Sequence, residues 1–442
     1  MTAAAGVSAS AEKSTTAHVV WASALGTAIE WYDFLIYGTA AALVLNKLFF
    51  PSFDPFVGTL AAFSTYAVGF VARPIGGAII GHYGDRLGRK KMLVLSLMIM
   101  GVSTVLIGAL PTYATVGALA PVLLVLLRLA QGVAVGGEWG GAVLMAVEHA
   151  PPQRRGFYGS WPQAGAPLGT LLATGAFFLV SLLPGDVFLT WGWRLPFLAS
   201  AVLIAAGLVI RLRVTESPAF QVVHQRKAEV RQPLLEVLRH HPRAVLLVAG
   251  AFLVQSTVAY VFIAYLATYG TAVVKAPRTT VLAVIMLSAV VSTALHLVAG
   301  ALSDRYGRKP VYLAGVIGMG VLIFPAFALF NTGNFALMLI GHVLIFGLAL
   351  SLAGGPTAAM FSEMFGSRIR YTGASVGYQL AGVFGAALSP IIAASLFEVF
   401  HSGYAIAIYV ALSAVISIIA VALMPESRGT DIIEDVEHAA IA

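Results

Sequence analysis

The chain has 442 residues, of which 59% are hydrophobic and only 10% are charged, and its formal net charge is +7. Soluble domains carry about 25% charged residues, so this composition excludes a water-soluble enzyme, a disordered chain and a nucleic-acid-binding arm. Cysteine is absent, which excludes disulfides, thiolate metal sites and cysteine nucleophiles.

The predicted elements are long apolar helices. Residues 1–17 are small and polar and lack the basic start and short apolar core of a secretory signal, so we expect a tail there. A membrane-spanning helix needs about 20 mostly apolar residues, and apolar runs between charge, proline or glycine breaks predict twelve of them. Because these runs are continuous rather than alternating, a β-barrel is disfavoured. Their ranges are 19–46, 55–81, 92–110, 120–147, 161–183, 191–210, 244–270, 279–302, 311–330, 335–361, 376–398 and 403–424.

The longest polar stretch divides the chain into six spans plus six. We therefore predict cytoplasmic tails at 1–17 and 425–442, an N-terminal six-helix bundle over 18–210, a central cytoplasmic linker over 211–243 and a C-terminal six-helix bundle over 244–424.

The basic residues predict the orientation. With the N-terminus inside, twenty Lys and Arg residues fall in cytoplasmic segments and four on the opposite side, while Arg73 and Arg128 lie within spans. Cytoplasmic loops of membrane proteins carry the excess of Lys and Arg. Both termini are therefore predicted to be cytoplasmic, and the positive charge indicates contact with membrane lipid rather than nucleic acid.

The two halves repeat each other. GHYGDRLGRKK at Gly81–Lys91 returns as GALSDRYGRKP at Gly300–Pro310, an offset of 219 residues. After the fourth span Glu148 stands seven residues before Arg155, and after the tenth Glu363 stands seven residues before Arg370. After the sixth and twelfth spans, Thr215–Pro218 and Pro425–Arg428 form a third pair of similar segments.

The repeated G-x-x-x-D-R-x-G-R-K pattern resembles the signature loop of the major facilitator superfamily. Other segments are similar to its metabolite:proton symporter family, which includes bacterial carriers for shikimate, α-ketoglutarate, citrate and proline/betaine. The resemblance implies an all-α membrane protein with twelve transmembrane helices in two six-helix pseudo-symmetric halves, in a bacterial cytoplasmic (inner) membrane, which transports rather than catalyses. The similar segments are GTAIEWYDFLIYG (Gly26–Gly38), RPIGG (Arg73–Gly77), RLAQGVAVGGEWGG (Arg128–Gly141), WGWRLPFL (Trp191–Leu198) and Phe361–Gln379.

The repeated loops also have a physical interpretation. Asp85 and Asp304 lie at predicted helix ends beside arginines, where a carboxylate pairs with a cation or caps a neighbouring helix. We predict that these groups tie the halves together on the cytoplasmic side, although plain topology charges and caps are the alternative. The residues assigned to this gate are Asp85, Arg86, Arg89, Asp304, Arg305, Arg308, Glu148, Arg155, Glu363, Arg370 and Arg73.

Charges inside spans predict the proton-coupling site. A central ionisable residue costs about 2.5–3.5 kcal/mol on insertion scales, so it usually faces a cavity and a partner. Glu30 and Asp33 share a helix face, and Asp33 lies near mid-membrane at a depth similar to Arg128. We predict that Asp33 carries the proton and that Arg128 attracts the substrate; a static ion pair is the alternative. Glu138 is predicted to brace the loop through Arg73, with direct coupling as its alternative.

Polar groups in apolar runs predict the substrate contacts. Because Arg128 has no arginine counterpart in the tenth span, we expect the C-terminal half to supply more of these contacts. Interfacial tyrosines and a hydrogen-bonded structural histidine are the alternative interpretations. The predicted substrate-binding residues are Arg128, Tyr32, Gln255, Tyr260, Tyr265, His296 and Tyr378.

The pattern as a whole predicts uptake of a small organic acid with protons by alternating access. The proton is the only coupling ion expected, with no other cofactor and no metal, and the protein is expected to work as a monomer. A proline/betaine symporter remains an alternative, as does a drug:proton antiporter, although the Gly-Pro pair expected in its fifth span is GAPLG here (Gly165–Gly169). A channel would not need mirrored gating loops, and a membrane enzyme would need a catalytic motif such as HExxH or GxSxG, which the sequence lacks.

Overall fold

A computed structural model describes residues 23–77, 79–80, 89–136, 138–148, 150–213, 233–366 and 369–429, and these ranges contain helices and connections but no strand. Twelve long apolar elements lie within them, as the sequence predicts. Eleven are long enough to cross a membrane, and Val94–Ala109, within α5 (Arg89–Ala109), is the shorter twelfth. The eleven are Ser23–Phe49, Pro55–Gly77, Leu119–Glu148, Pro152–Ser181, Gly192–Val209, Pro242–Ala272, Arg278–Tyr306, Arg308–Phe330, Phe335–Glu363, Arg370–Phe400 and Gly403–Leu423.

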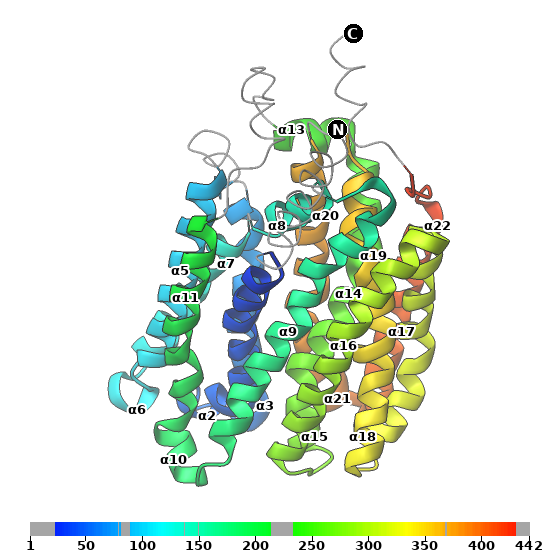
Figure 1. The fold of residues 1–442 in the computed structure, drawn as a ribbon. Coiled ribbons are helices and arrows are strands. Elements are labelled where there is room, and N and C mark those ends of the chain that lie inside the picture. The colour runs from blue at the N-terminus through cyan, green and yellow to red at the C-terminus, as the bar shows by residue number, and fades with distance from the viewer. Residues whose placement is uncertain are drawn as a thin grey trace, which may run out of the picture.

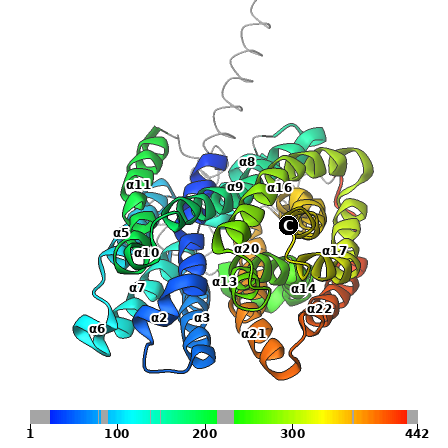
Figure 2. The ribbon, with the colours of Figure 1, turned by 90° about the horizontal axis from the view of Figure 1, so that it is seen from below.

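The spans form two bundles that stand side by side (Figures 1 and 2). The first contains the span Ser23–Phe49 with the helices α3 (Pro55–Val71), α5, α7 (Leu119–Val135), α8 (Trp139–Glu148), α9 (Arg155–Ser181) and α11 (Leu195–Arg213). The second contains α14 (Pro242–Tyr260), α16 (Arg278–Tyr306), α17 (Arg308–Phe330), α18 (Phe335–His342), α19 (Leu350–Glu363), α20 (Arg370–Ala381), α21 (Ser389–Phe400) and α22 (Gly403–Leu423). Short helices connect or extend these spans: α2 (Asn46–Phe49), α6 (Tyr113–Val116), α10 (Gly185–Thr190), α13 (Pro233–His240) and α15 (Leu266–Ala272).

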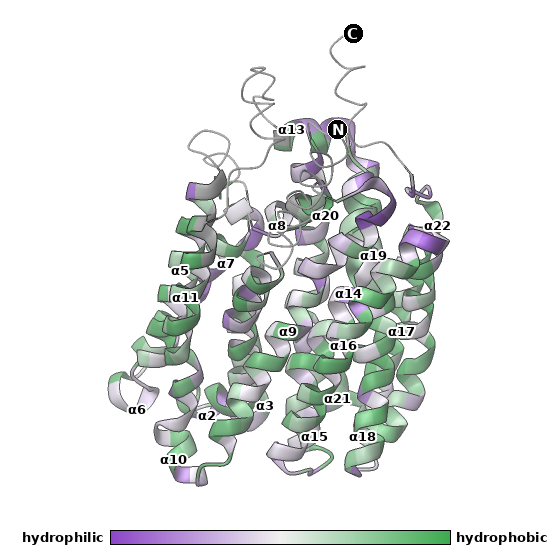
Figure 3. Cartoon of the chain, viewed as in Figure 1, coloured by the Kyte–Doolittle hydropathy of each residue, from purple (hydrophilic) through white to green (hydrophobic). Residues whose placement is uncertain are grey.

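The outer surface of the bundles is apolar, as a surface in contact with lipid must be. Leu179, Val202 and Val399 are 66%, 73% and 70% exposed, and apolar residues colour most of the length of the helices in Figure 3. In water, an apolar surface this extensive would be an aggregation hazard. In a bilayer it is the matching surface, because helices satisfy their backbone polar groups internally.

Glycines let helices of the first bundle approach closely. A Cβ atom on Gly132 of α7 would collide with the carbonyl oxygen of Gly69, and one on Gly136 with that of Arg73. Small residues at such positions bring the backbones of membrane helices into contact. The span carrying Arg73 is therefore fixed against the span carrying Glu138.

The two halves meet along α9 and α16, which run antiparallel and pack against each other. We call the end of the molecule that carries Asp304, Arg308 and Glu363 the signature end, and the end that carries Arg278 the opposite end. The predicted fifth and eleventh spans begin too late, because α9 already starts at Arg155 and α20 at Arg370. For α9 the reason is a carboxylate that satisfies its first backbone amides, described below.

Four segments have π-helical backbone within the spans. They are η1 (Ala41–Leu45), η4 (Val261–Tyr265), η5 (Val343–Ala349) and η6 (Gly382–Ala387). Single-turn π segments are frequent at functional sites. Three of the four contribute residues to the cavity described next.

Candidate functional site

A central cavity lies between the two halves. It holds about 660 Å³ of space not filled by atoms, open solvent included. The C-terminal half supplies most of its walls, as the sequence analysis expects. Its lining residues are Trp31, Phe70, Arg73, Gln163, Ala166, Pro167, Thr170, Phe252, Gln255, Ser256, Ala259, Tyr260, Ile263, Ser292, His296, Phe346, Leu350, Tyr378, Gly382 and Ala386.

Of the described residues that line this cavity, Arg73 is the cation and none is acidic. Its guanidinium carbon lies 4.2 Å from the ring centroid of Phe34 and 4.3 Å from that of Phe70. These two rings stand nearly perpendicular, at 84°, so the guanidinium occupies the corner between them. The sequence predicts Arg73 to belong to the gate, whereas its side chain lines the cavity.

A second, smaller cavity adjoins the first toward the signature end. It shares Trp31, Arg73, Gln163 and Tyr378 with the central cavity. Unlike the central cavity it contains acidic side chains, Glu30 and Glu138, and Glu138 accepts a hydrogen bond from Ser96 at 3.4 Å. Arg73 therefore stands at the boundary between an acid-free cavity and an acidic one.

Aromatic and amide contacts join the halves beside the second cavity. The rings of Trp139 and Tyr378 stack at 3.9 Å. Trp139 Nε1 donates to Gln163 Oε1 at 3.2 Å, and Gln379 Nε2 donates to the Gly136 carbonyl at 3.1 Å. Because Tyr378 and Gln379 belong to α20, and Trp139 and Gly136 to the first bundle, the ring stack and the Gln379–Gly136 bond must break if the halves separate at this end. The Trp139–Gln163 bond lies within the first bundle.

Arg128 is fully buried and lies outside both cavities. Its guanidinium carbon is 4.0 Å from the ring centroid of Tyr37 and 4.6 Å from that of Phe34. Its Nη1 donates to Gln131 Oε1 at 2.7 Å, while Nε and Nη2 have no hydrogen-bond partner. Phe34 thus lies between two buried guanidinium groups, those of Arg73 and Arg128.

Asp33 is also fully buried, and neither of its carboxyl oxygens has a hydrogen-bond partner. It does not pair with Arg128 in this conformation, which contradicts the ion pair that similar depth suggested. Depth along a helix does not fix direction around it, and Arg128 is directed at Tyr37 and Gln131 instead. An unpaired carboxylate in a membrane interior is costly, and binding a proton removes that cost.

The predicted substrate residues divide between the cavity and its surroundings. Those that line the central cavity, as expected, are Gln255, Tyr260, His296 and Tyr378. Tyr32 and Tyr265 are not among the residues lining either cavity; the Tyr32 hydroxyl donates to the Pro196 carbonyl at 2.7 Å.

Sequence reasoning missed several lining residues, including Trp31, Phe252 and Ser256. A usable signal existed for two of them, because Trp31 lies within the EWYDF segment and Ser256 adjoins Gln255 in an apolar run. Nothing in the sequence distinguishes Phe252 from the other members of the chain's 25 phenylalanines.

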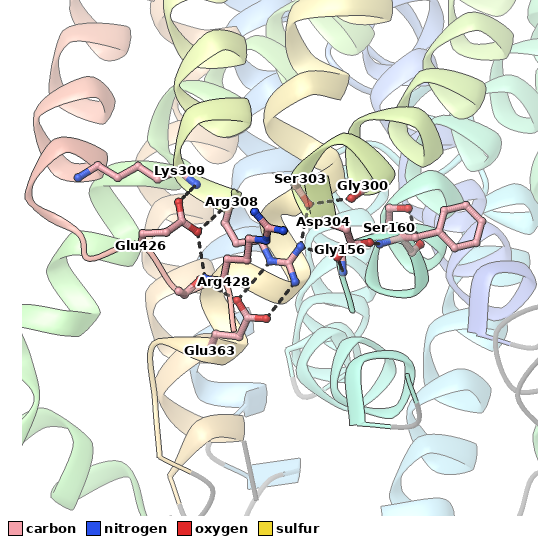
Figure 4. A network of polar contacts seen from close by, with 12 residues as sticks. Gly156, Ser160, Gly300, Ser303, Asp304, Arg308, Lys309, Glu363, Glu426 and Arg428 are labelled. Carbon is pink, nitrogen blue, oxygen red and sulfur yellow. Dashed lines mark hydrogen bonds and ion pairs between the residues drawn. The ribbon is translucent and has the colours of Figure 1, made fainter. Parts of the chain in front are cut away.

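At the signature end, Asp304 links the halves by capping a helix (Figure 4). Its carboxylate accepts hydrogen bonds from the backbone amides of Gly156 and Phe157, each at 2.8 Å. Those amides lie in the first turn of α9, where a negative charge is favoured by the helix dipole. Arg308 Nη1 also donates to Asp304 at 2.6 Å. Both contacts, the pairing with a cation and the helix cap, are among those that the sequence predicts for Asp304.

Arg308 extends this network to the C-terminal end of the chain's described part (Figure 4). Its Nη2 and Nε lie 3.3 and 3.4 Å from the carboxylate oxygens of Glu363, which also accepts from Ser427 at 2.7 Å. Glu426 accepts from the backbone amides of Arg308 and Lys309 at 2.8 and 3.0 Å and so caps α17.

The remaining gate residues have different places. Arg305 is exposed and stacks on Tyr306 at 5.3 Å, outside the network of Figure 4, so its assignment to the gate is corrected. Arg370 Nε donates to the carbonyls of Ser362 and Phe365 at 2.9 and 3.0 Å. Of the other predicted gate residues, Arg155 is buried and Glu148 is half-buried. Asp85 and Arg86 lie outside the described residues, and Arg89 starts α5 but its side chain is not described.

The opposite end has its own contact between α16 and α9. Arg278, the first residue of α16, donates from Nη2 to the Ser181 carbonyl at 3.0 Å and lies 3.8 Å over the ring of Phe188. Ser181 is the last residue of α9. The same two helices are thus joined by polar contacts at both ends.

Comparisons with known proteins agree with this architecture. The family described as "Sugar (and other) transporter" matches residues 19–243, and that described as "Major Facilitator Superfamily" matches residues 273–435. The chain is 44% identical to the inner membrane metabolite transport protein YhjE of Escherichia coli K12 over 419 residues, covering 93% of this chain and 94% of that one. It is 42% identical to the shikimate transporter of the same organism, covering 91% and 93%.

A proline/betaine transporter of Escherichia coli K12 is 35% identical, over 92% of this chain and 83% of that one. Among solved structures, the proton:xylose symporter XylE bound to 6-bromo-6-deoxy-D-glucose has a TM-score of 0.75 at 20% identity, with 97% of this chain and 99% of that chain covered. A partially occluded inward-open structure of XylE has a TM-score of 0.73 at 20% identity, covering 93% and 100%. These structural likenesses concern the fold.

Proposed function

Because the chain belongs to the major facilitator superfamily of membrane transporters, we propose that it carries a small organic acid together with protons into a bacterial cell by alternating access. It is a multi-pass membrane transporter and not an enzyme. The substrate, the coupling ion and the direction are the proposal.

The observation that carries this proposal is the charge of the central cavity. Among the described residues that line it, Arg73 is the cation and none is acidic. Buried cations inside a membrane are expensive unless they are paired. A negatively charged substrate supplies the missing pairing, so the site favours an anion over a neutral solute.

Coupling to protons follows from the buried acids. Asp33 is inaccessible and unpaired in this conformation, and Glu138 lines the second cavity, 1% exposed. We assign the coupled proton to Asp33, because a proton both neutralises its carboxyl group and offsets the charge of an entering anion. No other cofactor and no metal is proposed, and a monomer is the proposed working unit.

For orientation, we propose that the signature end faces the cytoplasm, since the predicted cytoplasmic segments hold most of the basic residues. Both termini are then cytoplasmic, and the membrane is the inner membrane of a bacterium.

A second candidate is a zwitterion such as proline or betaine. The central cavity is rich in aromatic rings, including Trp31, Phe70, Phe252, Tyr260 and Tyr378, and aromatic faces attract quaternary ammonium groups. In that case Arg73 would face the carboxylate of the zwitterion, and the relatives include a proline/betaine transporter.

The test is uptake by purified protein in sealed liposomes. With an alkaline interior, labelled shikimate should accumulate above its external concentration, and a protonophore should abolish the accumulation. Uptake that ignores the pH difference would refute proton coupling. Accumulation of labelled betaine in preference to shikimate would replace the organic acid with the second candidate.

A further inference from the structure

Two polar groups that line the central cavity lack a hydrogen-bond partner, and they come from different halves. They are Nε of Arg73, in the first bundle, and the hydroxyl of Tyr260, at the end of α14 in the second. Both side chains are buried, at 5% and 3% exposure. Leaving a buried polar group unpaired is destabilising, so both positions are suited to a ligand that supplies the partner.

One aromatic ring, that of Phe70, positions both groups. The Arg73 guanidinium carbon lies 4.3 Å from its centroid. The Tyr260 ring meets it edge-on, with centroids 4.9 Å apart and an angle of 86°. Trp31 stacks on Tyr260 at 6.3 Å, and Phe34 closes the other side of Arg73. The two donors are therefore held by packing on the wall of one cavity.

We propose that Arg73 and Tyr260 together bind the carboxylate of the transported molecule, one donor group from each half; this inference rests on the proposed function. The planar guanidinium presents parallel N–H donors that match a carboxylate, and the phenol hydroxyl adds a further donor. Arg128, which the sequence favoured for this role, is enclosed by Tyr37 and Gln131 and does not line the cavity.

The rest of the cavity indicates the class of molecule. Gln255, Ser256, Ser292 and His296 line it from the C-terminal half, and amide, hydroxyl and imidazole groups match the hydroxyls of a ligand. The geometry therefore fits a compact monocarboxylate that carries hydroxyl groups, with its carboxylate on Arg73 and Tyr260 and its hydroxyls toward α14 and α16.

The position of Tyr260 links binding to movement. The π-helical segment η4 begins at the next residue, so Tyr260 lies where the helix changes its winding. A carboxylate bound to both donors bridges the bundles, and it is released when they separate. Binding of the carboxylate should for this reason favour the conformation in which the halves are closed around the cavity.

The experiment measures binding of two probes, shikimate and its methyl ester, to purified protein in detergent by isothermal titration calorimetry. The acid should bind the wild type at least 10-fold more tightly than the ester, because the ester has lost its negative charge. R73Q should weaken binding of the acid by about 10–100-fold and reduce the preference for the acid over the ester to near unity. Y260F should weaken it by about 5–10-fold, and R73Q/Y260F should lose less than the two single losses combined.

R73K guards against a merely structural effect, because it retains the charge and loses the planar fork. It should keep part of the preference for the acid. R128K is the comparison, at an arginine on the same Phe34 ring but outside the cavity. It should keep the wild-type preference for the acid in this binding assay, although its uptake is expected to fall. Wild-type preference in R73Q, or its loss in R128K instead, would overturn the assignment.

The same design separates failure of this inference from failure of the proposed function. If the wild type binds betaine and not shikimate, the organic-acid proposal fails, and the Arg73 assignment is then judged with betaine and choline, which lacks the carboxylate. A wild-type protein that binds the ester as tightly as the acid, or choline as tightly as betaine, would refute the carboxylate site.

Discussion

Asn in place of Asp304 should open the signature end. The Asp304 carboxylate accepts two α9 amides at 2.8 Å each and pairs with Arg308 at 2.6 Å. Asn keeps one acceptor oxygen, turns its amide group toward the second donor and loses the charge. Hydrogen bonds to charged groups contribute about 1.5–3 kcal/mol, so losing one and weakening the others costs about 2–3 kcal/mol. That cost shifts the closed–open equilibrium by ~30–150-fold.

The shift is measured through a single cysteine, since the chain has none of its own. Ser375 of α20 contacts Gly140 of α8 across the two halves, and its hydroxyl has no hydrogen-bond partner. S375C should react slowly with a maleimide while this end is closed. Adding D304N should raise the labelling rate by at least 10-fold, whereas adding R305Q, at the exposed neighbour outside the network, should leave it unchanged. Equal labelling of S375C and S375C/D304N would refute the capping argument.

Three further predictions follow from the charged groups of the first half. D85N, at the position that repeats Asp304 with an offset of 219 residues, should cripple uptake while expression and shikimate binding persist; binding lost in step with uptake would place Asp85 in the site or the fold. D33N mimics the protonated carboxyl group, so it should still exchange internal for external labelled shikimate but fail to accumulate it under a pH difference. Normal accumulation would show that Glu30 or Glu138, and not Asp33, carries the coupled proton. R128K should lose most uptake, because lysine cannot reproduce both the stacking on Tyr37 and the bond to Gln131; wild-type uptake would reduce Arg128 to a structural charge.

The spans could be predicted because each depends on local sequence, and the capping role because a carboxylate beside arginines at a helix end has few alternatives. A run of about 20 apolar residues specifies a membrane helix without reference to its neighbours. The repeated Asp-Arg loop likewise has few physical options, and Asp304 fulfils two of them by pairing with Arg308 and capping α9.

The direction of single side chains could not be predicted, because it depends on how each helix is rotated against its neighbours. Arg73 and Arg128 both read as buried cations, yet only the first lines a cavity. Tyr260 directly precedes η4 and Tyr265 is its last residue, and only Tyr260 lines the central cavity. Hydropathy does not predict a π-helical segment. Because such a segment changes the number of residues per turn, the regular α-helical period does not predict which side chains after it face the cavity.

The pairing of α9 with α16 lets the two halves pivot about a polar contact at either end of these helices. The acidic residue Asp304 near the end of α16 meets the positive end of the α9 dipole, and the basic Arg278 at the start of α16 meets its negative end. When one end opens, the contact at the other end becomes the pivot. Sequence changes at the two ends should therefore tilt the balance between inward and outward access in opposite directions, without any change in the cavity itself.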